Sequence, residues 1–259
     1  MRLVKKRIQP HIMCGVGDVA RYALLPGDPD RVERIASHLD EARKVAEYRG
    51  YITYTGESMG IEITACSTGI GCPSAAIVVE ELMKIGSDTF IRVGTTGSLQ
   101  PHLDNGDIVI ATAAVRAEGT SRNYIPVEYP AAASLDVTLA LLQAAEELGI
   151  EVHPGIVMST DAYYGGDEEA IRKYGALNVL SIEMESSLIF TLAALRGMRA
   201  GAILVVDGNL TKGTGKGEFE PGEKTGELDE SVQNSIDEEI RVAVRACQIL
   251  EEAQDHSLL

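Results

Sequence analysis

The sequence lacks the segments that would place it in or across a membrane. No run in its 259 residues approaches the ~18 consecutive apolar residues of a membrane helix. Its basic start, Met1–Arg7, leads into Ile8-Gln-Pro-His11 rather than into the apolar core of a signal peptide. The sequence therefore predicts a soluble protein with no membrane partner.

Positive charge is also scarce. Lys and Arg number 23 against 39 acidic residues, which gives a net charge of −16 at pH 7. Nucleic-acid binding depends on clustered Lys and Arg against the phosphates, so this balance argues against DNA or RNA as a partner. We interpret the excess acid as a well-solvated surface, in which a few arginines would form a local positive pocket.

Cysteine and histidine patterns typical of metal sites are absent. The four cysteines form no CxxC pair, and the five histidines show neither HExxH nor another zinc spacing. We therefore expect Cys14, Cys66, Cys72 and Cys247 to be buried, reduced thiols of a cytoplasmic protein without a metal site.

The sequence does contain a regular alternation of strand-like and helix-like segments. Strand-like runs cover 22–25, 51–55, 61–67, 89–93, 107–114, 151–158, 179–182 and 202–206. Helical periodicity covers 29–39, 74–85, 135–148, 168–174, 184–195 and 230–252. No linker or shift in composition divides the chain. We predict a single α/β domain over 1–259, with a central mixed, mostly parallel β-sheet flanked by helices in three αβα layers.

Two of these strands end in residues suited to binding an anion. Arg92 lies inside the apolar run 89–93, and Gly94-Thr-Thr-Gly97 follows with hydroxyls and expected free backbone N–H groups. The run 22–25 stops at Pro26-Gly-Asp-Pro-Asp-Arg31, where Asp28 can cap a helix whose first turns hold Arg31. Together they predict a phosphate site at the carboxyl edge of a sheet.

Further polar and aromatic residues lie near predicted strand ends. Glu183 and Glu185 could accept hydrogen bonds from a vicinal diol, or simply favour a helix start. Asp207 follows the apolar run 202–206, where open α/β sheets place functional groups, although Asp-Gly is also an ordinary turn pair. Tyr163 could stack on a base, and an aromatic pair such as Tyr163-Tyr164 is also common in plain packing.

Four motifs in register carry a family resemblance over nearly the whole chain. They are Pro26-Gly-Asp-Pro-Asp-Arg31, Ser67-Thr-Gly-Ile-Gly71, Ile91-Arg-Val-Gly-Thr-Thr-Gly-Ser-Leu99 and Ile182-Glu-Met-Glu-Ser186. Together they resemble the nucleoside phosphorylase I family, which contains hexameric purine nucleoside phosphorylases and uridine phosphorylases. Within it, Val205-Val-Asp-Gly208 and Asp161-Ala-Tyr-Tyr164 look most like the purine nucleoside phosphorylase type of malaria parasites.

The resemblance implies a role for each matching residue. Phosphate would be bound by Gly27, Arg31, Arg92 and Thr95, together with Arg49. Ribose would contact His11, Met184 and Glu185, and the base would contact Thr96, Gly97, Tyr163 and Glu183. Asp207 would be the catalytic acid. The resemblance also implies a homo-oligomer, a hexamer built as a trimer of dimers, in which His11 and Arg49 cross the dimer interface.

The implied reaction is phosphorolysis of a nucleoside to free base and ribose 1-phosphate, with phosphate as co-substrate and no cofactor. Purines such as inosine and guanosine are favoured, because Asp167 and Glu169 stand where bacterial uridine phosphorylases carry a uracil-clamping glutamine and arginine. Asp207 would protonate purine N7. Uridine, or relaxed specificity, is the alternative. A nucleoside hydrolase is more remote, since it has no need of the phosphate arginines, as is a non-catalytic nucleoside-binding module.

Overall fold

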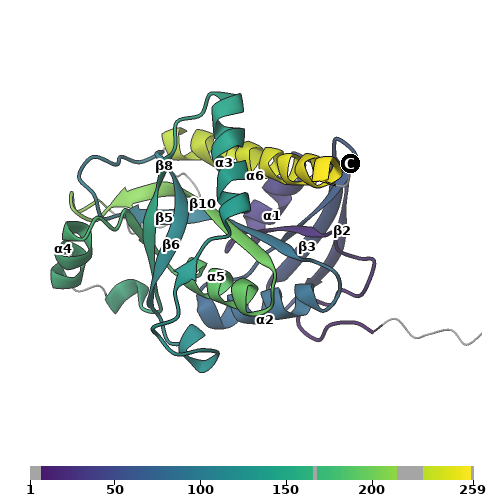
Figure 1. Cartoon of the computed structure of the whole chain (residues 1–259), viewed down its shortest axis with the longest axis horizontal. Helices are drawn as coiled ribbons and strands as arrows, with labels where there is room; N and C mark the ends of the chain where they lie inside the picture. The colour runs from purple at the N-terminus through teal and green to yellow at the C-terminus, as the bar shows by residue number, and fades with distance from the viewer. Residues whose placement is uncertain (1–6, 166–167, 215–229, 258–259) are drawn as a thin grey trace, which may run out of the picture.

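One mixed sheet runs through the described part of the chain, with helices on both faces (Figure 1). The computed structural model describes residues 7–165, 168–214 and 230–257. The strands are β1 Tyr22–Leu25, β2 Asp40–Tyr48, β3 Tyr51–Ser58, β4 Ile61–Cys66, β5 Thr89–Ser98, β6 Ile108–Ala117, β7 Ala131–Ala132, β8 His153–Thr160, β9 Ser181–Glu183 and β10 Arg199–Asn209. The helices are α1 Pro29–Ala36, α2 Cys72–Met83, α3 Leu135–Leu148, α4 Glu168–Ala176, α5 Ser186–Leu195 and α6 Glu230–Ser257, with 3₁₀ turns η1 Ser121–Asn123 and η2 Tyr163–Gly165.

The strand order is β10-β6-β8-β9-β5-β1-β4-β3-β2, with β7 beside β6. Because β10 also pairs with β5, the path β10-β6-β8-β9-β5 closes into a ring. Parallel pairing joins β1 to β4 and β5, β5 to β10, and β8 to β6 and β9. The strands β2, β3 and β7 add antiparallel pairs. The predicted mixed α/β sheet is therefore confirmed, and the ring brings the ends of β5, β8, β9 and β10 together.

Two apolar cores hold the helical layers against the sheet, and consecutive residues of β5 show how. Ile91 packs on the side of α3 and α6 with Leu141 and Ile240. Its neighbour Phe90 faces the opposite layer and packs with Ile189 of α5. Figure 1 shows α3 and α6 above the sheet and α2 and α5 below it. This alternation is what a strand buried on both faces requires.

The structure differs from the sequence prediction mainly at polar segments and element ends. Strand β2 was not expected, because its residues are mostly polar and exposed at the edge of the sheet. Helix α1 ends at Ala36, three residues short of the predicted Leu39. Strands β5 and β10 continue to Ser98 and Asn209, beyond the apolar runs that predicted them, because these polar ends still pair with each other.

All four cysteines are free and buried, as predicted from their spacing. Within the part of the chain that the structure describes, no helix is both long and apolar enough to cross a membrane.

Candidate active site

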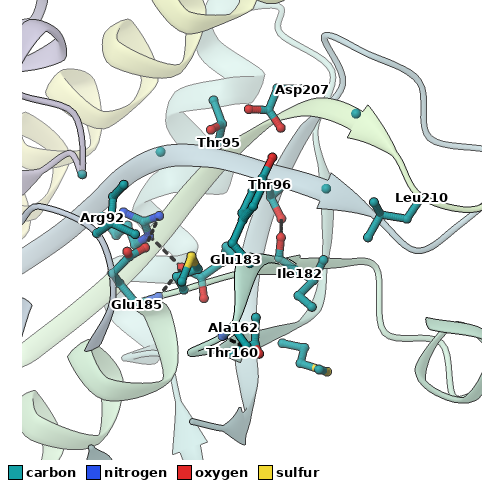
Figure 2. Close-up of a pocket in the computed structure, with 18 of the residues that line it drawn as sticks. Arg92, Thr95, Thr96, Thr160, Ala162, Ile182, Glu183, Glu185, Asp207 and Leu210 are labelled. Carbon is teal, nitrogen blue, oxygen red and sulfur yellow. Dashed lines mark hydrogen bonds and ion pairs between the residues drawn. The ribbon is translucent and has the colours of Figure 1, made fainter. Parts of the chain in front are cut away.

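A cavity of about 1150 Å³ opens where β1, β5, β8, β9 and β10 end (Figure 2). Most of the residues predicted for the site line it, although they are spread over more than 180 positions of the sequence. They are Gly27, Arg31, Arg92, Thr95, Thr96, Gly97, Tyr163, Glu183, Met184, Glu185 and Asp207. Figure 2 shows Arg92 and Glu185 at one side of the cavity and Leu210 at the other.

Arg92 is buried at the inner end of the cavity, where it contacts two carboxylates. Its Nε donates to Glu183 Oε2 at 2.7 Å, and its Nη2 lies 2.5 Å from Glu185 Oε2. Its Nη1 has no hydrogen-bond partner within the described residues. That atom lies beside Gly27, because a Cβ built on the glycine would sit 3.9 Å from it. One N–H edge of the guanidinium is thus left for an anion.

The charge on Arg92 is secured by its partners. Burial alone would disfavour the cation, but the nearby carboxylates of Glu185 and Glu183 outweigh burial and raise the pKa of Arg92 above its ordinary value. The guanidinium is therefore a permanent positive charge inside the cavity.

Gly94 follows Arg92 on β5, and here the expectation of free backbone N–H groups is wrong. The strand continues beside β10, pairing Gly94 with Leu204 and, after a one-residue shift in register, Ser98 with Asn209. The Gly94 N–H donates to Glu239 Oε1 at 2.8 Å. A side chain at Gly94 would meet Arg92, because a Cβ there would lie 2.9 Å from Cζ. Glycine at this position lets the guanidinium fold over the strand.

The second predicted anion-binding turn has the expected local structure. Asp28 caps α1 by accepting the Asp30 N–H at 3.0 Å, with Pro29 in the first turn of the helix. Arg31 lines the cavity, and its Nη1 lies 3.8 Å from Glu239 Oε2. The two arginines therefore approach the same inner end of the cavity from different elements.

Sequence reasoning missed Glu239. This carboxyl of α6 is fully buried below the inner end of the cavity, and burial raises its pKa to about 8 although Arg31 and the Gly94 amide oppose the shift. A signal was present, because Ile236, Ile240 and Ala243 define the buried face of α6 and Glu239 interrupts that face with a charge. A charged residue at an apolar-face position is rarely buried without a partner.

Glu183 and Glu185 stand at the junction of β9 and α5 and have different surroundings. The Glu183 carboxylate accepts from Arg92 Nε, from Ser159 Oγ at 2.5 Å, and from the backbone N–H groups of Glu185 and Ser186 at 2.9 and 3.0 Å. Glu185 Oε1 accepts the Gly71 N–H at 2.5 Å. Burial raises the pKa of Glu185, while Arg92 opposes the shift.

The outer part of the cavity is less charged. The Thr96 hydroxyl donates to the Ile182 carbonyl at 2.8 Å, and Tyr163 is 56% exposed at η2. Asp207 does not end β10 as expected, because the strand passes through an irregularity between Val206 and Gly208 and continues to Asn209. In Figure 2 the Asp207 side chain lies close to Thr95.

One of the two residues that stand in place of a uracil clamp lies in the described part of the chain. Asp167 lies outside the described residues, whereas Glu169 lies on α4. Ala170 and Ile171 of the same helix line the cavity, as do Met158, Thr160 and Leu210, none of which the sequence had singled out. Their contribution to the outer wall is apolar, apart from the Thr160 hydroxyl.

His11 and Arg49 are the predicted site residues that the structure does not bring to the cavity of their own chain. The His11 side chain is 39% exposed, and its Nδ1 lies 2.6 Å from Glu81 Oε1. Arg49 is exposed in the turn after β2, where its guanidinium lies 5.4 Å from the ring centre of Tyr48. Their contact with a neighbouring subunit stays a prediction.

One group of side chains near the site has the composition of a metal site. Cys72, Glu118 and Asp161 offer ligand atoms within 4.8 Å of one another. Each is already engaged, since Cys72 Sγ donates to the Met184 carbonyl, Glu118 accepts from Ser121, and Asp161 accepts from the Gly119 N–H. The group gives no reason to assign a metal.

A sequence model described as the phosphorylase superfamily matches residues 21–253. The chain belongs to this superfamily. The phosphorylase is 50% identical over 215 residues to uridine phosphorylase of Thermococcus kodakarensis, with 78% of each chain covered. It is 44% identical over 238 residues to guanosine phosphorylase of Halorubrum lacusprofundi, covering 92% of this chain and 97% of the relative. A crystal structure of uridine phosphorylase from Vibrio fischeri matches with a TM-score of 0.84 at 32% identity, covering 95% of this chain and 99% of that one.

These relatives confirm the resemblance to nucleoside phosphorylases drawn from the four motifs, and with it the phosphorylase fold. The phosphorylase is thus an enzyme, a pentosyltransferase acting on nucleosides. These relatives are named for two different nucleosides, uridine and guanosine.

Proposed function

We propose that this phosphorylase transfers the ribosyl group of uridine to inorganic phosphate, giving uracil and ribose 1-phosphate. The main observation behind this proposal is the contact between Arg92 and Glu185 inside the cavity. The guanidinium keeps one N–H edge for an anion, and Glu185, 2.5 Å away, offers a carboxylate that can accept from the ribose hydroxyls. The nucleophile and the sugar that it attacks would thus be held side by side.

Position along the cavity supports the contacts proposed for each part of the substrates. At the inner end, phosphate would contact Gly27, Arg31, Arg92 and Thr95. Next to it, ribose would contact Met184 and Glu185, and further out the base would contact Thr96, Gly97 and Tyr163. Glu183 is surrounded by donors of its own chain, so we propose that it orients Arg92 and the α5 N-terminus rather than the base.

The proposed chemistry is a displacement through a ribosyl cation. Phosphate fixed by Arg31 and Arg92 would be both the nucleophile and the negative charge that stabilises this cation. The departing base takes up negative charge, and for a purine base a positioned acid such as Asp207 can contribute roughly 10²–10⁴ in rate by protonating N7. The displacement is redox neutral and phosphate supplies the nucleophile, so we propose that no further cofactor takes part.

The relatives support uridine more strongly than the purine preference expected from the sequence. Uridine phosphorylases include the 50% identical Thermococcus enzyme and the Vibrio structure. The second candidate is guanosine or inosine. It is favoured by Asp207, which lines the cavity and can protonate purine N7, and by the Halorubrum guanosine phosphorylase, which matches 92% of this chain.

Competing nucleosides decide between the two candidates. Initial rates of base release at saturating phosphate would be measured for uridine, guanosine, inosine, adenosine and methylthioadenosine. We expect kcat/KM for uridine to exceed that for guanosine by at least about tenfold, a difference that one or two polar contacts to the base can supply. The reverse order would overturn the uridine proposal and establish the purine candidate.

We also propose that the working form is a homo-oligomer, a hexamer of three dimers, in which His11 and Arg49 of one subunit complete the cavity of its neighbour. Exposed apolar side chains close to His11 in sequence support an interface, with Ile8 44%, Met13 45% and Val16 69% exposed. Mixing the impaired His11→Ala and Arg92→Lys proteins under subunit exchange at subsaturating phosphate should raise activity above that of either variant alone, because one composite site per mixed dimer carries neither change. Full activity of a demonstrably monomeric preparation would refute the proposal.

We propose from the state of its thiols that the enzyme is located in the cytoplasm. The four cysteines are free and buried, which supports a place in the reducing cytoplasm, where nucleosides and phosphate are also at hand.

A further inference from the structure

Helix α6 places one carboxyl directly behind the inner end of the cavity. Glu239 is completely buried, and its two oxygens have different surroundings. Oε1 accepts the Gly94 N–H at 2.8 Å. Oε2 has no hydrogen-bond partner within the described residues, and Arg31 Nη1 lies 3.8 Å from it. The carboxyl therefore touches both anion-binding elements while leaving one oxygen available.

The charges around this end of the cavity do not favour a dianion as they stand. Two guanidinium groups, of Arg31 and Arg92, face three carboxylates, those of Glu183, Glu185 and Glu239. With all five ionised the group carries an excess negative charge, and phosphate would add up to two more. In a buried site such an excess is costly.

Of the three carboxyls, Glu239 is the one suited to take up a proton. Glu183 accepts hydrogen bonds from four donors, so both of its oxygens are already engaged. Glu185 Oε2 lies 2.5 Å from Arg92 Nη2. Glu239 has the longer ion pair, its Oε2 has no hydrogen-bond partner within the described residues, and burial raises its pKa to about 8.

We propose that Glu239 is a positioning residue for phosphate, which holds Gly94 and Arg31 and carries a proton on Oε2 whenever phosphate is bound, taking that proton up on binding where the carboxyl was ionised before. The inference rests on the proposed function, since phosphate is its ligand. The proton comes from solvent and returns to it on release. Oε1 keeps the Gly94 N–H throughout, while neutral Oε2 no longer competes with the anion for Arg31.

The main charges acting on Glu239 come from groups that do not take up this proton, and the comparison with Glu239→Gln separates Glu239 from Glu185, whose pKa burial also raises. Helix α1 contributes Arg31 and Arg34, and β5 contributes Arg92 and the Gly94 amide. Arginines stay charged across the accessible pH range. A proton taken up around pH 8 and 9 is therefore assigned to Glu239 rather than to these neighbours.

The test is calorimetric titration of the whole enzyme with inorganic phosphate at pH 7 and pH 9. Buffers of different ionisation enthalpy give the number of protons taken up. Three proteins are compared: wild type, Glu239→Gln and the control Glu238→Gln, which removes the same charge from the next residue of α6. Phosphate titrates near neutrality in all three, so the readout is the difference between proteins.

The ratio of the wild-type Kd to the Glu239→Gln Kd is expected to rise about tenfold between pH 7 and pH 9, since the wild type must bind one more proton above the pKa of Glu239. At pH 9 the wild type and Glu238→Gln should take up about one proton more than Glu239→Gln. A ratio that is constant with pH, or equal proton uptake in all three proteins, overturns the inference and leaves the proposed function standing. A wild type that binds no phosphate at either pH overturns both.

Discussion

Replacing Arg92 by lysine separates its role in holding the site from its role in binding phosphate. The guanidinium uses Nε for Glu183 and Nη2 for Glu185, and keeps Nη1 for the cavity. A lysine ammonium can stay between the two carboxylates but cannot present this third direction. The lost charge-assisted hydrogen bond is worth about 1.5–3 kcal/mol. We therefore expect kcat/KM for phosphate to fall by roughly 10- to 150-fold.

The assay varies phosphate at saturating nucleoside and is paired with thermal unfolding. Arg92→Ala serves as the contrast. The structure shows that this variant leaves Glu183 and Glu185 buried without their cation. It should lose about 3–5 kcal/mol of stability, whereas the lysine variant should lose less. Near-normal kcat/KM for phosphate in a stably folded Arg92→Lys protein would refute the reasoning.

Three further predictions concern neighbouring groups. Gly94→Ala should raise KM for phosphate and lower stability by about 1–3 kcal/mol, because its Cβ would lie 2.9 Å from Arg92 Cζ; unchanged kinetics would contradict this. Asp207→Asn should reduce guanosine turnover by roughly 10²–10⁴ and uridine turnover much less, because uracil has no N7; equal losses would exclude Asp207 as the N7 acid. Glu239 has a pKa of about 8 when folded against an ordinary 4.5, so its contribution to stability is complete below about pH 4.5 and is lost as pH rises to about 8, by up to ~1.4 kcal/mol per pH unit. Chemical unfolding across that range should show this slope in the wild type, and its persistence in Glu239→Gln would contradict the assignment.

The sheet and its core could be predicted from the sequence, because the apolar pattern of a strand or helix depends only on residues close together in the chain. The consecutive apolar residues Phe90 and Ile91 predict a strand buried on both faces, and the structure confirms this prediction. The polar strand β2 was not predicted, because its composition does not favour a strand. Its pairing with β3 holds it in the sheet. The polar ends of β5 and β10 were not predicted as strand for a related reason. Glycine and threonine look like a turn until the partner strand is known.

The site was predictable where chemistry follows directly on a strand end, as at Arg31 and Arg92. It was not predictable where a distant element supplies the contact. Glu239 meets Gly94 across 145 positions of sequence, and only its place on the apolar face of α6 hinted at burial. The expected free N–H of Gly94 failed for the same reason, since the accepting carboxylate belongs to another part of the chain.

Phosphate dependence tests the central claim most directly. Purified enzyme would be incubated with uridine or guanosine, with and without inorganic phosphate, and ³¹P NMR would follow the phosphorus. The account predicts base release only with phosphate, together with one equivalent of ribose 1-phosphate for each base released. Release of base without phosphate, or with free ribose as the product, would contradict it.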